Sequence, residues 1–493
     1  MPTNTTKRKR ARSAGSGKRP TGAKIRTPAR QRELPLLQGV RYDALTDKNL
    51  IDHWRWADSR SIDASLDADV RRRLRERARY EVANNSYAFG CALALANAVV
   101  GSGPRIQILS DLTQEQTRRA EWDFAEWSTE INLAEKLRSM RFARFQDGES
   151  FAILHTNRRL DGPVQLDVRP IDCERVCAEY GAADACDVDG IRLDEYGNPV
   201  SYRVLTRHPG DADALDPRSW IEEAVEYPAE YVVHWYRRNT SEQRRGAPEL
   251  TASLNLFALL RRYTLAVVTA AETAADFAAI MYTDAPNDVE SAEPFETFNI
   301  ERGLMMTAPE GWKVGQLKSE QPTTTYQEFK RELLGEIGRS LQIPVNIIMG
   351  DSARYNYASG RLDHQEFQKA VRIDQAQCGQ SVMRKIFRQW WREYAVSVGL
   401  SASAVPSAVW YWDGFEHVDP VKEANAQAVR LAAKTTNLSI EYGKQGRDWE
   451  DELMQIARER EKMRELGLTV EEAVPAPDID DDQSPERDSP SRS

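Results

Sequence analysis

The sequence predicts a mixed α+β fold that is mainly helical, and three observations support this prediction. Apolar residues recur three and four positions apart over several long stretches, which is the pattern of amphipathic helices. Short runs between about residues 120 and 240 alternate apolar and polar residues, which is typical of strands. Both ends lack either pattern and are rich in charge, Pro and Ser, so we expect disordered tails at 1–33 and 471–493.

The first helical pattern begins near Asp67 with the stretch DADVRRRLRERARYEVANNSYAFGCALALANAVV. Its apolar residues keep helical spacing to Gly101, which is expected to end the helix as a C-cap, and the strand RIQIL follows. The Arg cluster at 71–79 is interleaved with Glu76 and Glu81. We interpret the cluster as a salt-bridged, solvated face, and a nucleic-acid surface is the alternative.

From about 120 to 240 the pattern changes from helices to strands. Two helical stretches precede a turn at Asp147, and the alternating runs after it are expected to form antiparallel strands laid against helices. His155 and His234 fall in these runs among apolar neighbours, and we expect satisfied core or interface histidines rather than ligands. Asp147 and Glu149 are interpreted as turn and capping residues.

Long helices dominate the second half of the chain. One is predicted at 249–282 and would be roughly 50 Å long at about 1.5 Å per residue. A second is predicted at 326–342, with a hairpin at 304–317 between them. A third helical stretch of roughly 38 residues follows Gly360, far longer than the mean helix, and two more helices follow residue 415. Ordinary globular enzymes rarely need helices of this length.

The segment IMGDSARYNYASGRLDHQEF, residues 348–367, separates two of these helices. An apolar run ends at Gly350, and a polar stretch leads to Gly360. Glycine permits backbone conformations that other residues rarely adopt, so both glycines are predicted to be hinges of a flexible loop. The loop is basic and aromatic through Arg354, Tyr355 and Tyr357.

Charge and cysteine content narrow the class of protein. The 493 residues carry a net charge of −9, yet the leader 1–33 is strongly basic and the tail 471–493 strongly acidic. The leader could contact nucleic acid or an acidic partner surface, or be a solvated segment. The five cysteines fit neither a zinc pattern nor a disulfide framework, which favours reduced thiols in a cytosolic protein. Arg261 and Glu272 interrupt the most apolar region, so we predict no membrane span.

Motifs that indicate catalysis are missing from the sequence. The chain contains no P-loop, no HExxH, no GxSxG and no Cys and His set with metal-ligand spacing. We therefore predict that the protein is not an enzyme, with no catalytic residue, no metal site and no cofactor. Several long helices around a flexible polar loop indicate a geometric role instead.

Four stretches, in this order and spacing, carry a resemblance to a known family. They are RLRERARYEVANNSYAFGCALALANAVVGSG, GESFAIL, IGRSLQIPVNIIMGDSARYNYASGRLDHQEF and WDGFEHVDPVKEANAQAVRLAAKTTNLSIEYGKQGRD. Over residues 40–465 the chain resembles the lambda-like family of tailed-bacteriophage portal proteins. The resemblance implies the portal fold, with wing, stem, clip and crown regions, and a closed ring of about twelve copies around a DNA channel.

The resemblance also divides the chain into regions. It implies a basic disordered leader at 1–33, a mixed wing at 40–240, stem helices at 248–342 with the clip inserted at about 283–325, a tunnel loop and long spine helix at 349–400, a helical crown at 401–470 and an acidic disordered tail at 471–493. The tunnel loop would face DNA, and its candidate contacts are Arg354, Tyr355, Tyr357 and Arg361. For each tyrosine, packing between neighbouring subunits is the alternative.

The function implied by the resemblance is that of a structural head–tail connector at the unique capsid vertex, the conduit for DNA packaging and ejection. The partners implied are further copies of the chain, non-specific double-stranded DNA, the large terminase subunit, head-completion and tail adaptor proteins, and major capsid and scaffold proteins, with no membrane. The terminase ATPase would supply the energy, and the chain would be a passive sleeve assembled in the host cytoplasm and carried in the virion. The leader could be cleaved, face DNA or bind scaffold.

Two other classes of protein stay open on the sequence. A monomeric nucleic-acid-binding packaging adaptor would use the Arg-rich segments and would show steep salt dependence. A metal-dependent, nuclease-like packaging factor would need clustered carboxylates that bind Mg²⁺. A closed assembly distinguishes the portal reading from the adaptor, and metal-dependent nicking would reveal the nuclease.

Overall fold

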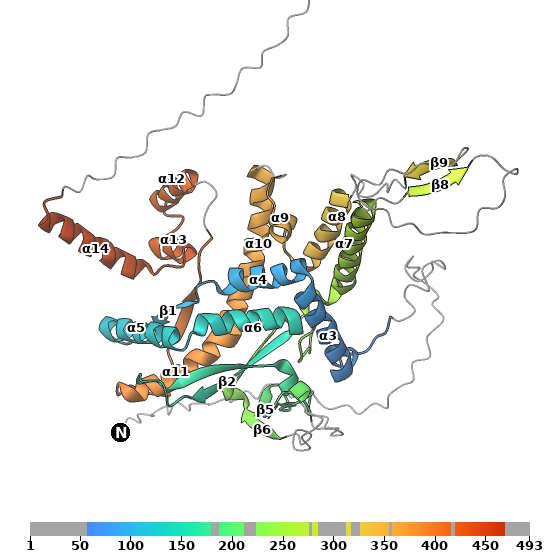
Figure 1. The fold of residues 1–493 in the computed structure, drawn as a ribbon. Helices are drawn as coiled ribbons and strands as arrows, with labels where there is room; N and C mark the ends of the chain where they lie inside the picture. The colour runs from blue at the N-terminus through green and yellow to red at the C-terminus, as the bar shows by residue number, and fades with distance from the viewer. Residues whose placement is uncertain are drawn as a thin grey trace, which may run out of the picture. The chain divides into compact units, whose positions relative to one another are not determined.

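The computed structural model describes most of the chain, and Figure 1 shows its elements. It describes residues 57–178, 187–211, 223–275, 279–283, 312–316, 326–353, 357–415 and 420–468. Within these ranges most regular structure is helical, and the strands form antiparallel sheets of two or three strands. The prediction of a mainly helical α+β fold is therefore confirmed. The leader 1–33 and the tail 471–493 lie outside the described residues.

Helices α3 (Ala68–Asn84) and α4 (Ser86–Val100) replace the single helix expected before Gly101. They are separated at Asn85, whose backbone is extended and whose side chain accepts a hydrogen bond from the amide of Tyr87 at 3.1 Å. Asn85 thus ends one helix and caps the next. Gly101 ends α4 with a φ of 56°, which confirms the predicted C-cap.

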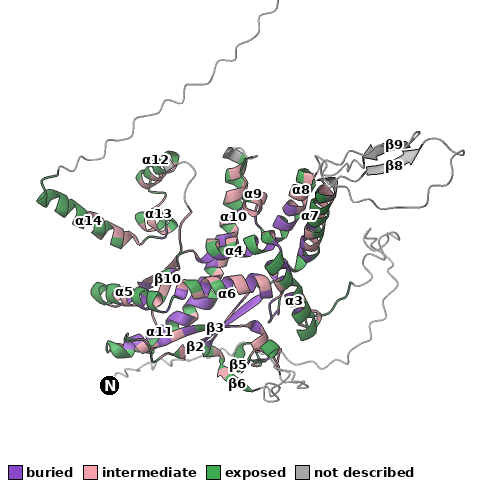
Figure 2. Ribbon diagram, viewed as in Figure 1, coloured by how far each residue is buried: buried purple, intermediate pink, exposed green. Residues whose placement is uncertain are grey.

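Three strands form the sheet on which the fold is built. In spatial order they are β3 (Leu166–Ile171), β2 (Glu149–Thr156) and β7 (Val232–Tyr236), all antiparallel. The first six residues of β2 are buried because both of its faces are covered, as Figure 2 shows. Ala152 packs into the main helical core, while Phe151 packs into a second apolar cluster. Covered faces explain why the middle of this strand, residues 151–154, is continuously apolar.

The helices that contribute to the main core come both before and after this sheet in the sequence. Helix α5 (Gln114–Glu130) begins with a capping box formed by Thr113 and Gln116, and α6 (Leu133–Asp147) ends at Gly148 with a φ of 91°. A side chain added at Gly148 would meet the backbone of Ala247, so only glycine fits here. The predicted pair of helices followed by a turn and a strand is confirmed.

The second sheet has the order β4 (Ile191–Leu193), β5 (Pro199–Leu205) and β6 (Ala224–Pro228). The predicted turn between the first two strands is present, with Gly197 at a φ of 80° and the Asp194 carboxylate accepting from backbone amides within the turn. The short remaining elements of this half are α2 (Ile62–Ser65), η1 (Cys173–Arg175), η2 (Pro209–Asp211), η4 (Ala229–Tyr231) and η5 (Glu249–Ala252).

One long-range strand pair was not predicted from the sequence. The predicted strand β1 (Arg105–Leu109) pairs antiparallel with β10 (Ser407–Tyr411), about 300 residues later in the chain. Because strand pairing at this separation has no local signature, the partner could not be inferred from periodicity. The pair joins the strand that follows α4 to a strand beyond the long third helix.

Helix α7 (Leu254–Ala275) is shorter than predicted. The expected helix ran to residue 282, but β8 (Ala279–Thr283) occupies its last residues. The sequence of β8, AIMYT, is rich in residues that favour strands, which explains the change. At about 1.5 Å per residue α7 spans roughly 33 Å rather than the roughly 50 Å expected.

Strand β8 pairs antiparallel with β9 (Trp312–Gln316), a pairing that was not predicted from the sequence. The hairpin predicted within 304–317 stays a prediction. Residues 304–311, the expected first strand, lie outside the described residues. Helix α8 (Tyr326–Leu341) follows and confirms the helix predicted at 326–342.

The third long helix is confirmed as α10 (Tyr357–Cys378) and α11 (Arg384–Ser397), joined by one π-helical turn, η6 (Gly379–Met383). A side chain at Gly379 would come within 3.1 Å of the Trp410 ring, so β10 packs directly on this turn. Beyond β10 lie α12 (Pro420–Ala432), α13 (Leu438–Lys444) and α14 (Trp449–Glu465), three helices where two were expected.

An aromatic cluster joins α11 to α5 and β10. The Trp390 ring stacks on Tyr394 at 4.5 Å between centroids and meets Phe124 edge-on at 5.1 Å, while Phe124 also lies 5.7 Å from Trp410. Such geometries add to the free energy gained by burial. Helices from opposite ends of the sequence are thereby held in one core.

Replacing Trp390 by Ala is expected to lower the free energy of unfolding by about 3–5 kcal/mol, because the side chain is fully buried and leaves a cavity. Thermal unfolding followed by circular dichroism at matched protein concentration measures the change. The control, Val396→Ala on the same helix, removes a side chain that is 71% exposed and should change stability by less than about 0.5 kcal/mol. Equal effects of the two variants would contradict this account of the core.

Candidate channel segment and buried ion network

The loop predicted to face the channel lies between α9 (Val345–Met349) and α10. Gly350 ends α9 with a φ of 62°, a left-handed conformation that favours glycine. Helix α10 begins at Tyr357, so Gly360 lies inside the helix rather than before it, and the loop is shorter than expected. Arg361 is on the same helix and is exposed. Arg354, Tyr355 and the side chain of Tyr357 lie outside the described residues.

Asn346 and His364 hold the base of this loop together, and neither residue was predicted from the sequence to be part of the site. Asn346 is buried, and its side-chain amide lies 3.1 Å from Nε2 of His364, which joins α9 to the second turn of α10. The backbone carbonyl oxygen of Asn346 accepts from the backbone amide of Asp351 at 3.1 Å. A polar clasp therefore fixes where the loop leaves and re-enters the helices. The sequence signal was limited to an Asn two residues after Pro344, the N-cap of α9.

The two helices α7 and α8 pack through aromatic rings and leave apolar side chains of α7 uncovered. The Tyr263 ring lies 4.9 Å from that of Phe329. Leu259, Leu265 and Val268 of α7 are about half exposed. By length and composition alone the segment Leu254–Glu272 could cross a membrane, and 17% of it is buried.

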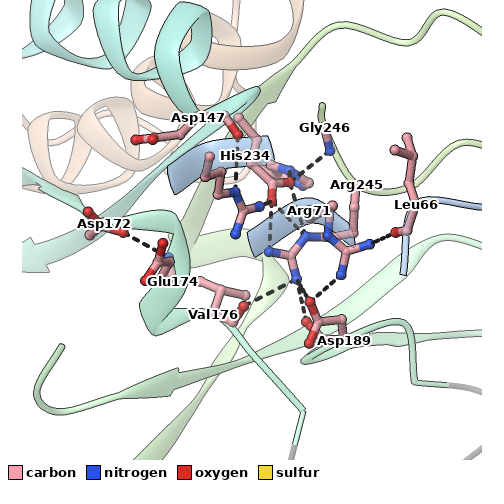
Figure 3. A network of polar contacts seen from close by, with 12 residues as sticks. Leu66, Arg71, Asp147, Asp172, Glu174, Val176, Asp189, His234, Arg245 and Gly246 are labelled. Atoms are coloured by element: carbon pink, nitrogen blue, oxygen red, sulfur yellow. Dashed lines mark hydrogen bonds and ion pairs between the residues drawn. The ribbon is translucent and has the colours of Figure 1, made fainter. Parts of the chain in front are cut away.

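Glu149 is the centre of a buried ion network, and Figure 3 labels its partners His234, Arg245 and Gly246. Its carboxylate has no solvent exposure and accepts bonds from Arg75 at 2.5 Å, from Arg245 at 2.7 Å and from the amide of Gly246 at 3.0 Å. Nε2 of His234 lies 3.0 Å away. Because the network unites α3, β2, β7 and the segment before η5, it fixes these elements relative to one another.

Helix α3 supplies two further arginines to the network. Arg71 pairs with Asp189, and Arg79 donates from Nε to Asp147 at 2.6 Å. Together with Arg75 these arginines are spaced four residues apart, so they share one face of the helix. That face is buried against carboxylates rather than turned to solvent.

The electrostatics of the network favour a fully ionised Glu149 beside a neutral histidine. Burial alone would raise the pKa of the Glu149 carboxyl, but Arg245, the bond from His234 and Arg75 together hold its pKa well below the usual range. Burial lowers the pKa of the His234 imidazole, and the contact with Glu149 offsets only part of this effect. A neutral His234 with its proton on Nε2 therefore donates to the Glu149 carboxylate.

Burial raises the pKa of Asp147, against the opposing effect of Arg79. The opposite holds at Asp189, where Arg245 and Arg71 outweigh burial and lower the pKa. Each of these carboxylates forms an ion pair with a guanidinium group, as expected for residues that stabilise the fold. Removing one partner of such a buried pair costs about 3–5 kcal/mol, since the other charge is left uncompensated.

Several sequence interpretations of this region need correction. The Arg cluster is not a solvated face at Arg71 and Arg75, which are 2% and 4% exposed, and buried residues cannot form a nucleic-acid surface either. Glu149 is no turn residue but the most buried acid of the network. The pairing partners lie 74 and more residues away, which local spacing could not reveal.

The two histidines behave differently. His234 is satisfied within the core, as predicted, through Glu149 and through stacking on Phe151 at 4.2 Å. Nδ1 of His155 is buried without a hydrogen-bond partner among the described residues, so that histidine is not satisfied as expected. Among the described residues, no group of three His, Cys, Asp or Glu side chains is placed to hold a metal ion.

Long packed helices, a loop clasped at its base and a buried ionic brace are the geometry of a structural protein. A sequence model of the lambda family of phage portal proteins matches residues 47–375, about two thirds of the chain. This chain belongs to the lambda family of phage portal proteins, which confirms the resemblance seen in the sequence.

One relative is 24% identical over 298 residues, which is 57% of this chain and 56% of the relative: a protein described as a probable portal protein of Halomonas phage phiHAP-1. The chain thus spans little more than half the length of that relative. Two solved chains from gene transfer agent particles are also similar. One, in the virion of the native particle, has a TM-score of 0.40, 13% identity and covers 81% of this chain and 94% of its own length. The other, in the neck computed with C12 symmetry, has a TM-score of 0.41, 14% identity and covers 76% and 94%.

Replacing Asn346 by Ala is expected to loosen the loop without unfolding the chain. Losing a net hydrogen bond costs about 1 kcal/mol, which makes local opening about fivefold more frequent. The initial rate of tryptic cleavage at Arg354 and Arg361, followed by mass spectrometry, should rise accordingly. Ser352→Ala, at an exposed position in the same loop, is the control. A cleavage rate unchanged by Asn346→Ala would show that the clasp does not restrain the loop.

His234 predicts a pH dependence of stability whose sign follows from its lowered pKa. Below the ordinary histidine pKa of about 6.5, the unfolded chain binds a proton at His234 that the folded chain does not bind. The free energy of unfolding therefore falls as the pH falls from about 7 to 5, by up to about 1.4 kcal/mol per pH unit. His234→Gln keeps a donor for Glu149 but does not titrate, so its slope should be smaller. Urea unfolding at several pH values measures both. His155→Gln is the matched control, and a wild-type slope in His234→Gln would refute the assignment.

Proposed function

We propose that copies of this chain form the portal ring of a phage capsid and that this ring is the conduit for DNA. The observation that carries the proposal is the family match over residues 47–375. The uncovered apolar residues of α7 support it, because a neighbouring copy in a closed ring would bury them. The ring would contain about twelve chains, as the family resemblance implies.

The regions follow from this proposal. The braced unit from about 60 to 240 would be the wing, α7 and α8 the stem, and the segment between them, which includes β8 and β9, the clip. Residues 350–356 and the start of α10 would form the tunnel loop, and α12 to α14 the crown. The large terminase subunit and the head-completion proteins would dock at the clip, with capsid and scaffold proteins around the ring.

The loop would touch DNA without holding it. Each neutralised phosphate adds affinity through counterion release, so a ring of tight contacts would stall movement. One or two arginines per copy, Arg354 and Arg361, on a loop that starts at the left-handed Gly350, would give transient and sequence-independent contacts. Tyr355 and Tyr357 would line the same surface. Translocation energy would come from the terminase, and this chain would supply the sleeve.

The decisive experiment is the native mass of the purified protein, with negative-stain images for symmetry. We expect a closed ring of about twelve times the 56.0 kDa mass of one chain, with a central hole. Replacing both Leu259 and Leu265 by Glu should prevent closure, because charges would have to be buried in the subunit interface.

The matched control for this pair is Val421→Glu with Val429→Glu, two exposed apolar positions on α12, outside the proposed stem. Control rings should form normally. A wild-type chain that stays monomeric at all salt and protein concentrations and binds DNA with steep salt dependence would instead indicate the packaging adaptor. Metal-dependent nicking of DNA would indicate the nuclease-like factor.

A further inference from the structure

A groove of about 880 Å³ separates helix α5 from the start of helix α14. Trp122 of α5 and Met454 of α14 are among the apolar side chains that line it. No residue of α14 is buried, and Figure 2 shows this helix largely exposed along its length. A helix with so little buried surface is held weakly, so a small change in free energy is enough to move it.

The chain is anchored to the rest of the fold immediately before α14 begins. Nη1 of Arg105 donates to the carbonyl oxygen of Gly446 at 2.6 Å. A side chain at Gly446 would meet the carbonyl oxygen of Trp412, so the two segments approach closely here. Beyond this anchor, Nε2 of Gln114 donates to Glu450 at 3.4 Å, which is long for such a hydrogen bond. The anchor at Gly446 therefore provides a pivot about which α14 can turn.

Carboxylates from both helices line the groove. Glu121 of α5 lies on one side and accepts a hydrogen bond from the amide of Ile108 at 2.6 Å. Asp448 and Asp451, at the start of α14, lie on the other side, and Glu450 is close enough to act on the Glu121 carboxyl. Like charges that face each other across a groove repel, so an ionised Glu121 opposes contact between the helices.

The arginines around the groove do not bridge the two helices. The further titratable groups there are Glu115, Arg118, Arg119 and Asp123 of α5, Arg105 of β1, Tyr411 of β10, Arg447 and Glu452. Arg119 pairs with Asp123 at 3.0 Å, and Arg447 lies 3.8 Å from Glu452. Within residues 57–178 and 420–468 no ion pair within 4 Å joins α5 to α14. The repulsion between the carboxylates is therefore only partly compensated.

The pKa values reflect this arrangement. Burial raises the pKa of the Glu121 carboxyl to about 7, the bond from Ile108 opposes the effect, and the neighbouring acids of α14 add to it. Burial and Asp448 likewise raise the pKa of Asp451. If α14 turned away, Glu121 would lose both influences, and its pKa would fall toward the ordinary value of 4.5. Contact between the helices therefore loses stability as the pH rises from about 4.5 to about 7, and above about 7 the loss is complete.

We propose that α14 is a pH-dependent arm, which lies against α5 while Glu121 is protonated and turns away when Glu121 loses its proton to solvent. Turning about Gly446 separates the like charges and returns the Glu121 carboxylate to water, where its charge is stable. Under the proposed function α14 belongs to the crown, so the shape of that region would respond to pH. The arm itself needs only one chain and does not depend on ring formation.

Double electron–electron resonance of the full chain tests the proposal by measuring the position of the arm. One spin label is attached at Arg158→Cys, on an exposed loop of the body, and one at Arg458→Cys, on the exposed surface of α14. Cys177 and Cys186 are replaced by Ser, and the other three cysteines are buried. Labelled chains are diluted with unlabelled chains, so that each distance is measured within one copy.

The ratio of the open to the closed population should rise at least about tenfold between about pH 5.5 and about pH 8, because a pKa difference of more than about one unit between the two positions shifts the equilibrium by that factor. Glu121→Gln cannot ionise, so this variant should keep the closed distance at both pH values. Glu126→Gln, at an exposed position on the same helix, is the matched control and should respond as the wild type does.

Asp451→Asn removes one of the charges that act on Glu121 and should move the midpoint of the transition to lower pH. A wild-type distance that is the same at both pH values would overturn the proposal. So would a wild-type response in Glu121→Gln, or an unchanged midpoint in Asp451→Asn. The native mass at both pH values reports ring formation separately, so a failure of the proposed function and a failure of the arm are distinguishable.

Discussion

The fold depends on a single buried carboxylate, that of Glu149. Four donors from three separate parts of the chain converge on it: Arg75 of α3, His234 of β7, and Arg245 with the amide of Gly246 just before η5. An ionised carboxylate without solvent is tolerated only when such partners surround it. The brace therefore couples helix, sheet and connecting chain, and the loss of any one donor would leave charge exposed in the interior. Helix α7 follows directly from this anchored segment.

Periodicity predicted the helices well because each one buries a continuous stripe. Helix α8, with Leu334, Ile337 and Leu341 buried, lies where it was predicted to lie. Contacts between distant segments were not predictable: the β1 and β10 pair, and the burial of Arg71 and Arg75, depend on partners far along the chain. Of the candidate site, Gly350 and Arg361 could be placed, while Asn346 and His364 gave no local signal. Local spacing describes a face of a helix but not what covers it.

A continuous series of packed contacts links the proposed loop to the core. The clasp between Asn346 and His364 fixes the loop to the start of α10, and α10 runs through the π-helical turn η6 into the aromatic cluster around Trp390. At η6 the ring of Trp410 packs on Gly379, so the helix is held where its hydrogen-bonding pattern changes. A force applied at the loop would thus be borne by the largest buried aromatic side chains rather than by flexible connections.

The part of the chain whose charges are paired internally and the part whose apolar side chains are uncovered are different. The region around Glu149 satisfies its charges internally and needs no neighbour, whereas α7 leaves leucines half exposed. Burying apolar area yields about 25 cal/mol per Å², so these leucines gain most when another copy covers them. In the proposed ring the braced region would hold its geometry before assembly, and the stem would reach its final packing only on closure. A chain built this way favours the closed ring over partial arcs, because an arc leaves one stem face uncovered at its end.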